Sequence, residues 1–170
     1  MARTSNIFHN LVTDEDSTTE LLCNLMRFAA FRRPLLARLL SEACASQIVY
    51  DDIDTQVDLR GSGRPDIVIK NEDVCALVEV KVTQYQGLTD NQPDGYFSFL
   101  LNDETRERWL LFLVPKDWIH LGSLNESLAR LTAANRAGGI RTGVVYWDDV
   151  LTVIEENDLQ ALNPFLADFS

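Results

Sequence analysis

The stretch GRPDIVIKNEDVCALVEVKV, residues 63–82, has the pattern of a β-hairpin. Two apolar runs flank a turn-forming Asn-Glu-Asp sequence at 71–73, as expected for two strands joined by a tight turn. Three charged residues, Asp66, Glu79 and Lys81, nevertheless lie within or beside these apolar runs. Strand positions of this kind favour Val and Ile. The two acids and the base therefore need an explanation other than packing.

The length of the turn decides whether the two acids of the hairpin meet. With a two-residue turn at 72–73, Asp66 falls opposite Glu79, at a Cβ separation of ~5 Å. With a three-residue turn, Asp66 falls opposite Val78 instead, one step from Glu79. Residues two apart on a strand point to the same face, so Lys81 lies beside Glu79 in either case. The first register brings all three charged groups into one patch.

A patch of this composition is suited to a divalent metal ion. Two close carboxylates repel each other, so either one is protonated or a cation lies between them. Oxygen ligands of this type suit Mg²⁺ or Mn²⁺, which keep several waters and use few protein carboxylates. Lys81 beside the metal could hold or help deprotonate an attacking water and offset negative charge on a phosphate. These features indicate metal-assisted phosphodiester hydrolysis.

The same residues resemble the signature of the PD-(D/E)XK nuclease superfamily. RPD, which ends at Asp66, and EVK at residues 79–81 match its two halves with a typical intervening length. The resemblance extends over residues 14–156, and its specific part is these central motifs. It implies that Asp66 and Glu79 bind the metal, that Lys81 assists the nucleophilic water, and that the fold contains a restriction-endonuclease-like core.

Two further features match parts of that superfamily. Many members add a glutamate from the first helix, and the resemblance assigns this catalytic, metal-binding role to Glu20. Glu20 also completes an S-x-x-E capping box with Ser17, so both interpretations stay open. Gln92 and Tyr96 resemble the Q-x-x-x-Y motif of the RecB-like branch, which borders the active site and orients it or contacts nucleic acid. The alternative is a first-turn helix residue and a core aromatic.

Two arginines in the segment RGSGR are candidates for substrate binding. Arg60 and Arg64 flank two glycines just before the hairpin. A flexible basic loop of this kind could clamp a phosphate backbone, and it could equally be a solvated turn. The net charge of −11 argues against tight non-specific binding to DNA, although it does not exclude a local basic strip.

The order of periodic segments predicts an α/β fold. We expect a three-layer α/β/α sandwich around a central mixed sheet, with a right-handed crossover between parallel neighbours. The expected helices occupy residues 17–31, 34–45, from 91, 123–139, 148–157 (capped by Asp148) and 158–169. The expected strands occupy residues 47–60, the two halves of the hairpin, 108–115 and 140–147.

The length and composition predict a single domain over residues 1–170. The first residues lack the pattern of a signal peptide, and no apolar run approaches the ~20 residues that span a bilayer, so we expect a cytosolic protein with no membrane partner. Cys23, Cys44 and Cys75 are scattered among apolar neighbours and are expected to be small buried hydrophobes.

The sequence and the resemblance together predict a Mg²⁺- or Mn²⁺-dependent deoxyribonuclease acting in DNA repair, recombination or defence against foreign DNA. A chain of 170 residues leaves no room for a separate recognition domain, so specificity is expected from a homodimer, a protein partner or DNA structure. Two alternatives stay open. One is a nuclease-fold interaction module that binds a basic protein partner, and the other is an RNA-directed nuclease with the same site.

Overall fold

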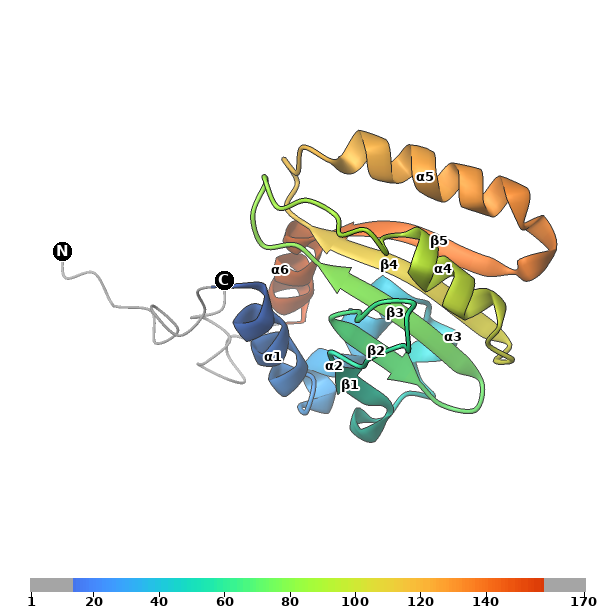
Figure 1. Ribbon diagram of the computed structural model, residues 1–170. Coiled ribbons are helices and arrows are strands. Elements are labelled where there is room, and N and C mark those ends of the chain that lie inside the picture. Colours follow the sequence, from blue (N-terminus) through green and yellow to red (C-terminus); the bar gives the residue numbers. More distant parts are fainter. Residues whose placement is uncertain (1–13, 158–170) are drawn as a thin grey trace.

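The hairpin lies at the centre of a five-stranded sheet (Figure 1). The computed structural model describes residues 14–157, and the sheet has the order β1-β2-β3-β4-β5. The first three strands are antiparallel neighbours, whereas β3, β4 and β5 run parallel, so the sheet is mixed. The strands are β1 Ile53–Thr55, β2 Ile67–Lys70, β3 Val74–Val80, β4 Glu107–Val114 and β5 Ile140–Tyr146.

The register of the hairpin is the one set by the two-residue turn. Ile67 lies opposite Val78, and the pairing continues to Lys70 opposite Cys75. The backbone N–H of Asn71 donates to the Val74 carbonyl at 3.0 Å, and its side-chain oxygen accepts from the backbone amide of Val74 at 2.9 Å. These bonds close the turn locally. The same register places the residue before Ile67, Asp66, opposite the residue after Val78, Glu79.

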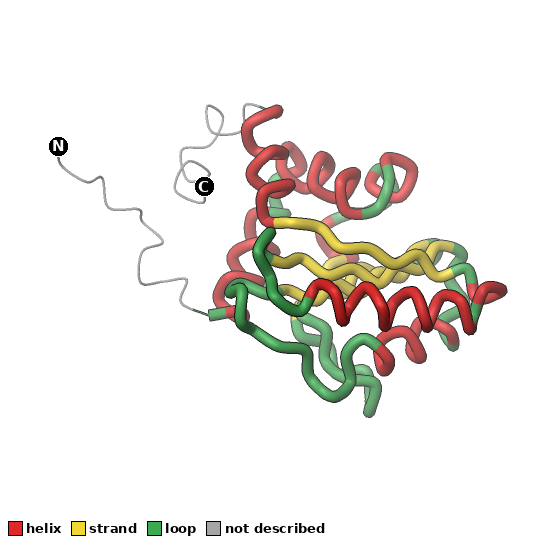
Figure 2. Tube along the Cα trace, turned by 90° about the horizontal axis from the view of Figure 1, so that it is seen from above, coloured by secondary structure: helices red, strands yellow, loops and turns green. Residues whose placement is uncertain are grey.

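Helices cover both faces of the sheet (Figures 1 and 2), as expected for an α/β sandwich. Side chains of β3 alternate between the two faces: Val78 packs with the cluster beneath α1, α2 and α6, and Leu77 packs with α4 and α5. Because both faces are buried, every residue of β3 is buried. The helices are α1 Glu15–Leu25, α2 Ala29–Leu39, α3 Glu42–Ala45, α4 Asp94–Leu101, α5 Leu121–Ala134 and α6 Trp147–Glu156, with 3₁₀ turns η1 Tyr50–Asp52 and η2 Arg136–Gly138.

The first predicted helix is interrupted earlier than expected. It ends at Leu25, a new helix begins at Ala29, and Pro34 lies inside that second helix instead of starting it. The buried Arg32 explains the interruption, because its guanidinium donates to the Met26 carbonyl at 2.9 Å. This side chain satisfies a carbonyl that the end of α1 leaves without an intrahelical partner. The stop signal is thus a contact from the next helix and not a local Gly or Pro.

The strand predicted over residues 47–60 is wrong over most of its length. Only Ile53–Thr55 is extended and paired, and it is preceded by the η1 turn. The Asp52 carboxylate accepts from the Val49 backbone at 2.8 Å and closes that turn. After β1, the backbone of Gln56 and Arg60 has positive φ angles of 52° and 50°, which end the extended conformation.

Two predictions near the end of the chain have different outcomes. Helix α6 is present, but its start is capped by Asp149 and not by Asp148: the Asp149 carboxylate accepts from the Tyr146 backbone at 3.0 Å. The helix predicted over residues 158–169 lies outside the described residues. Cys23, Cys44 and Cys75 are free and buried, as expected.

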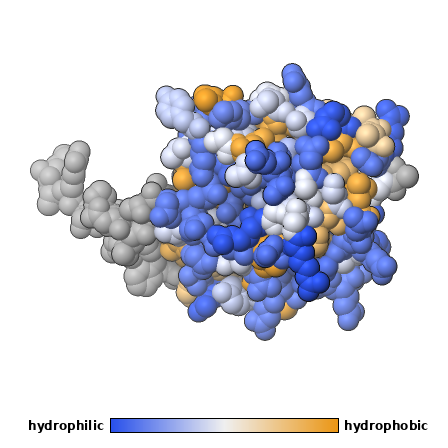
Figure 3. Space-filling view, viewed as in Figure 1, coloured by the Kyte–Doolittle hydropathy of each residue, from blue (hydrophilic) through white to orange (hydrophobic). Residues whose placement is uncertain are grey.

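The described surface carries few large apolar side chains. The face in Figure 3 is mostly hydrophilic, with scattered apolar residues. Within residues 14–157, no helix has both the length and the apolar character needed to cross a bilayer.

The loop between β1 and β2 packs against the start of α4 through two glycines. A Cβ at Gly63 would meet Tyr96 Cε1 at 2.7 Å, and a Cβ at Gly95 would meet the Ser62 carbonyl oxygen at 2.5 Å. Gly63 also has a φ of +109°, which side chains of L-residues rarely tolerate. The RGSGR segment is therefore held against the helix that carries Tyr96.

We expect Gly63→Ala to destabilise the protein more than Gly61→Ala. Both positions have positive φ, but a Cβ at Gly61 meets no atom within 4 Å. Backbone strain alone predicts a loss of ~1–2 kcal/mol for Gly61→Ala, and the clash with Tyr96 adds ~1–3 kcal/mol for Gly63→Ala. Urea unfolding of both variants measures the difference, and equal losses would contradict the packing of this loop on α4.

Candidate metal centre

Three carboxylates from distant parts of the chain meet at the carboxyl end of β3. Glu79 lies within β3, Asp66 directly precedes β2, and Glu15 is the first residue of α1. One oxygen from each lies within 4.8 Å of the other two. Sequence analysis predicted two members of this group, Asp66 and Glu79, and the hairpin register places them opposite each other.

Glu79 is the most fully bonded of the three carboxylates. It is 2% exposed, and its Oε1 accepts from Lys81 Nζ and from Gln92 Nε2, both at 2.6 Å. The Tyr96 hydroxyl donates to the other oxygen at 3.0 Å. Gln92 and Tyr96 therefore contact the site, as the Q-x-x-x-Y resemblance implies, although α4 begins at Asp94 and Gln92 lies just before it.

Burial leaves Asp66 with a strongly shifted pKa. Its side chain is buried, and Oδ2 accepts from the Val80 backbone at 2.7 Å. Burial and the nearby Glu79 carboxylate together raise the pKa of Asp66 to about 8, although the Val80 amide acts in the opposite direction. Without a cation, Asp66 is therefore largely protonated at neutral pH.

Lys81 is the cation that the protein itself supplies to this group. Its Nζ lies 2.6 Å from Glu79 Oε1 and 3.2 Å from Glu15 Oε2, and the side chain is 2% exposed. Burial alone lowers the pKa of an ammonium group, but the two carboxylates outweigh it and raise the pKa of Lys81 above its ordinary value. Lys81 is therefore charged at neutral pH.

Bonds to its backbone fix the position of Lys81. Its N–H donates to the Leu113 carbonyl of β4 at 2.8 Å, so the β3–β4 ladder continues one residue beyond β3. The Trp147 indole, at the start of α6, donates to the Lys81 carbonyl at 2.8 Å. The ammonium group is consequently held by a rigid backbone and by two carboxylates.

The glutamate of α1 that lies beside Asp66 and Glu79 is Glu15, and the structure places Glu20, to which the resemblance assigns this role, outside the group. Glu20 Oε1 instead accepts from the Thr55 hydroxyl at 2.5 Å. The predicted capping box is also shifted, because Asp14 is the N-cap and pairs with Ser17. Residues five apart on a helix point about 140° away from each other, so Glu15 and Glu20 cannot share a site.

Gln86 holds Glu15 and is a site residue that the sequence did not single out as such. Its amide nitrogen donates to Glu15 Oε2, and its amide oxygen accepts from the Val82 backbone at 3.0 Å. Burial is the main cause of the raised pKa of Glu15. The acidic run 14–16 was visible in the sequence, but it is equally explained by the positive end of the helix dipole.

The two arginines of the RGSGR segment contact other groups. Arg64 donates to the Gln56 side chain at 2.7 Å, and the backbone of Arg60 donates to Asp58 at 2.9 Å. In the described part of the chain, neither guanidinium is hydrogen-bonded to the three carboxylates. The loop nevertheless borders the site through Gly63 and Tyr96.

The geometry of the carboxylates fits a divalent cation. Oxygens that surround Mg²⁺ at about 2.1 Å lie about 3–4 Å from one another in an octahedral shell. The three oxygens, all within 4.8 Å of one another, need only small side-chain movements to reach such a shell. When ionised, the three carboxylates carry more negative charge than Lys81 offsets, and a cation would oppose the burial and the Glu79 charge that raise the pKa of Asp66.

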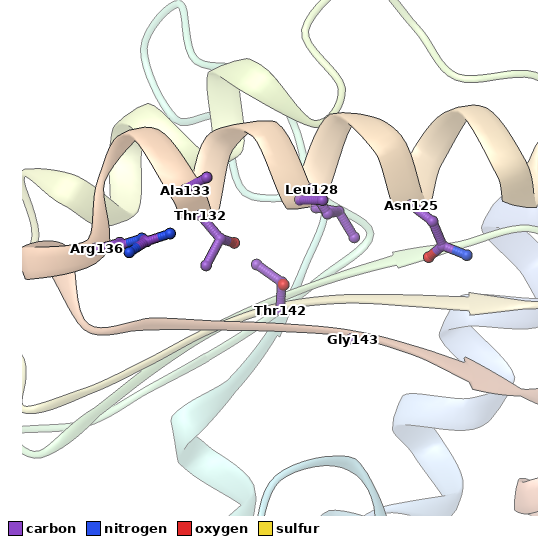
Figure 4. Close-up of a pocket in the computed structure, with 8 residues that line it drawn as sticks. Asn125, Leu128, Thr132, Ala133, Arg136, Thr142 and Gly143 are labelled. Atoms are coloured by element: carbon purple, nitrogen blue, oxygen red, sulfur yellow. The ribbon is translucent and has the colours of Figure 1, made fainter.

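A separate hollow of about 460 Å³ lies between α5 and β5 (Figure 4). Thr132 of the helix and Thr142 of the strand face each other there, with Arg136 at one end. Its lining residues include no carboxylate, so it does not compete with the acidic group as a cation site.

Comparison of the chain with models of protein families, with curated proteins and with solved structures finds no match in any of the three. The site must therefore be interpreted from its own geometry and chemistry.

In metal-free buffer, we expect stability to fall as the pH rises from 5 to 8. The pKa of Asp66 is about 8 in the folded chain against 3.8 ordinarily, so unfolding in this range releases a proton. The loss is at most ~4 kcal/mol, at about 1.4 kcal/mol per pH unit. Urea unfolding in EDTA at several pH values measures it.

Asp66→Asn should flatten this pH dependence because it removes the titrating group and keeps an oxygen for the Val80 amide. Asp54→Asn, at an exposed position on β1, is the matched control and should leave the dependence intact. The same slope in the wild type and in Asp66→Asn would contradict the raised pKa.

Substitution of the two α1 glutamates should separate their roles. Mn²⁺ at 100 times its Kd should stabilise the wild type by about 2.7 kcal/mol. We expect Glu15→Gln to lose most of this gain and Glu20→Gln to keep it, because only Glu15 reaches the other carboxylates. Thermal melts with and without Mn²⁺ measure the gain, and the reverse result would restore Glu20 as the ligand.

Proposed function

We propose that this protein is a Mg²⁺- or Mn²⁺-dependent deoxyribonuclease of the PD-(D/E)XK type. The observation that carries the proposal is the convergence of Glu15, Asp66 and Glu79 around the buried ammonium group of Lys81. A metal group made only of carboxylates, with a lysine in direct contact, is suited to phosphodiester hydrolysis.

The ligand set favours a hard cation. Glu15, Asp66 and Glu79 offer only oxygen, and no His or Cys belongs to the described group. Carboxylate oxygens suit Mg²⁺ and Mn²⁺, whereas zinc sites mostly use Cys and His. When bound, such an ion lowers the pKa of a water and stabilises charge on a phosphate.

The structure favours an electrostatic role for Lys81. Its pKa is raised, so the side chain is a hydrogen-bond donor and not a base in this state. From its position between Glu79 and Glu15, the ammonium group can orient a water and offset the charge that develops on a phosphate oxygen.

Gln92 and Tyr96 support the proposal by fixing the orientation of Glu79. Each donates a hydrogen bond to the carboxylate, and Gln92 also donates to the Tyr96 hydroxyl at 3.2 Å. Burial raises the pKa of Tyr96, so its hydroxyl stays neutral and keeps donating. A carboxylate held in this way is preorganised for its ligand.

The arrangement of elements also supports membership of this superfamily. A helix that carries an acid, a hairpin that carries the two motifs, and a crossover helix followed by a parallel strand occur in the order that the resemblance predicts. A restriction-endonuclease-like core is part of the proposal. So is a homodimer or a protein partner that supplies specificity.

The proposal predicts metal-dependent cleavage of DNA. Plasmid and labelled oligonucleotides should be cut with Mg²⁺ or Mn²⁺ and left intact in EDTA. Glu79→Gln and Lys81→Met should each lower the cleavage rate by about 100-fold or more, because each removes a charge aimed at the reacting group. Circular dichroism of both variants checks that they fold.

Lys70→Met provides a matched control on the same hairpin. Lys70 pairs with Asp103 at the far end of β2 and is half-exposed, so its loss should leave cleavage unchanged. The same sequence in deoxy and ribo form distinguishes a DNA enzyme from an RNA enzyme. If the wild type neither cuts nor binds DNA or RNA in Mg²⁺ or in Mn²⁺, the nuclease proposal fails. An interaction module then takes its place.

A further inference from the structure

The loop that follows β3 carries a prominently exposed aromatic side chain next to the site. Tyr85 is 71% exposed. It directly precedes Gln86, whose amide contacts the Glu15 carboxylate, and it follows Lys81 by four residues. Consecutive Cα atoms are about 3.8 Å apart, so the Tyr85 Cα lies no more than about 15 Å from the Lys81 Cα.

The backbone beneath this ring is fixed by a second loop, residues 115–120. The Ile119 N–H donates to the Gln84 carbonyl at 3.1 Å, and the Trp118 indole donates to the Gln86 carbonyl at 2.7 Å. Between them, His120 Nε2 lies 3.4 Å from the Tyr85 carbonyl oxygen. Three successive carbonyls are thus held in place while the Tyr85 side chain projects into solvent.

A second large apolar side chain lies on the supporting loop. Ile119 is 60% exposed, and its backbone is bonded to the residue before Tyr85. We call these two residues the rim pair. In the described part of the chain, the large exposed apolar side chains are Phe28, Val49, Tyr85 and Ile119. Two of the four therefore lie together beside the acidic group.

A single exposed apolar residue is normal on a protein surface. The rim pair differs because its backbone is held by hydrogen bonds, so the loop loses little further conformational entropy when a base stacks there. It also borders the group to which the proposed function assigns the chemistry. These two features favour a binding role over chance exposure.

We propose that the Tyr85 ring stacks on an unpaired base of the nucleic-acid substrate, next to the phosphate that is cut. This inference rests on the proposed function and defines its substrate class: single strands, flaps or frayed ends. A base within a duplex is already stacked on both sides, so it cannot offer its face to Tyr85. Ile119, on the adjoining loop, offers further exposed apolar surface.

Stacking also suits the charge of this chain. With a net charge of −11, the protein gains little from general attraction to phosphates. Stacking on an aromatic side chain is largely independent of net charge and tolerates any base, because every base has a π-face. Tyr85 therefore supplies affinity that electrostatics cannot.

Binding of an oligonucleotide that contains 2-aminopurine tests the inference without relying on cleavage. The protein carries Glu79→Gln so that a labelled single strand stays uncut in Mg²⁺. We expect binding to quench the fluorescence of 2-aminopurine at an unpaired position. Adding Tyr85→Ala should abolish the quenching and weaken binding by about 10-fold, whereas Tyr85→Phe should retain both because stacking needs only the ring.

Phe28→Ala is the matched control for loss of an exposed aromatic ring. Phe28 is 54% exposed and follows the C-terminal end of α1, whereas Glu15 lies at its N-terminal end. The two ends of this helix are about 15 Å apart. Phe28→Ala should leave binding and quenching unchanged. The inference would be overturned if Phe28→Ala and Tyr85→Ala had equal effects, or if Tyr85→Ala kept full quenching. It would also be overturned if the wild type bound no single strand.

Kinetics of the chain with Glu79 intact separate binding from chemistry. Tyr85→Ala should raise the KM for a single-stranded oligonucleotide by about 10-fold and leave kcat within about twofold, because the carboxylates and Lys81 are untouched. If the wild type does not cleave but the quenching still depends on Tyr85, the nuclease proposal fails and the stacking site stands. If cleavage occurs and Tyr85→Ala changes neither KM nor quenching, the nuclease proposal stands and the stacking site fails.

Discussion

The buried ion pair between Glu79 and Lys81 is the constraint on which the rest of the structure depends. Their charged atoms lie 2.6 Å apart, and both side chains are at most 3% exposed. Loss of one partner from such a pair leaves an unpaired buried charge, at a cost of ~3–5 kcal/mol. The surrounding donors, Gln92 and Tyr96, therefore matter for stability as well as for function.

The pair is not balanced by the residues around it. Asp66 and Glu15 place two more carboxyl groups beside it, and burial raises the pKa of both, which disfavours their charged forms. A protein selected only for stability would replace these groups with apolar residues of similar size. Retention of three carboxylates around one ammonium group is the kind of local conflict that is typical of functional sites.

The charged groups are positioned by strand β3, which is buried on both faces of the sheet. Strand β3 leaves Glu79 no freedom, and β4 and Trp147 fix the backbone of Lys81. The adjoining loop presents Tyr85 at the rim while Gln86 reaches inward to Glu15. Residues 79–86 thus both hold the charged groups in place and expose the Tyr85 ring to solvent.

Local features of the fold could be predicted from the sequence. Alternation and turn chemistry predicted the hairpin and limited it to two registers, because these depend on neighbours within about fifteen residues. The structure has the two-residue register, in which Asp66 meets Glu79. The contact of Gln92 and Tyr96 with the site was implied only by their resemblance to the Q-x-x-x-Y motif.

Which glutamate of α1 joins the acidic group depends on packing between distant parts of the chain. Glu15 and Glu20 are equally reasonable in sequence, and the choice depends on where α1 begins and how it packs beside the sheet. The end of α1 and the role of Gln86 were also hidden, because a side chain from elsewhere in the chain, Arg32 or Glu15, completes each of them. Partners of this kind leave no periodic trace in the sequence.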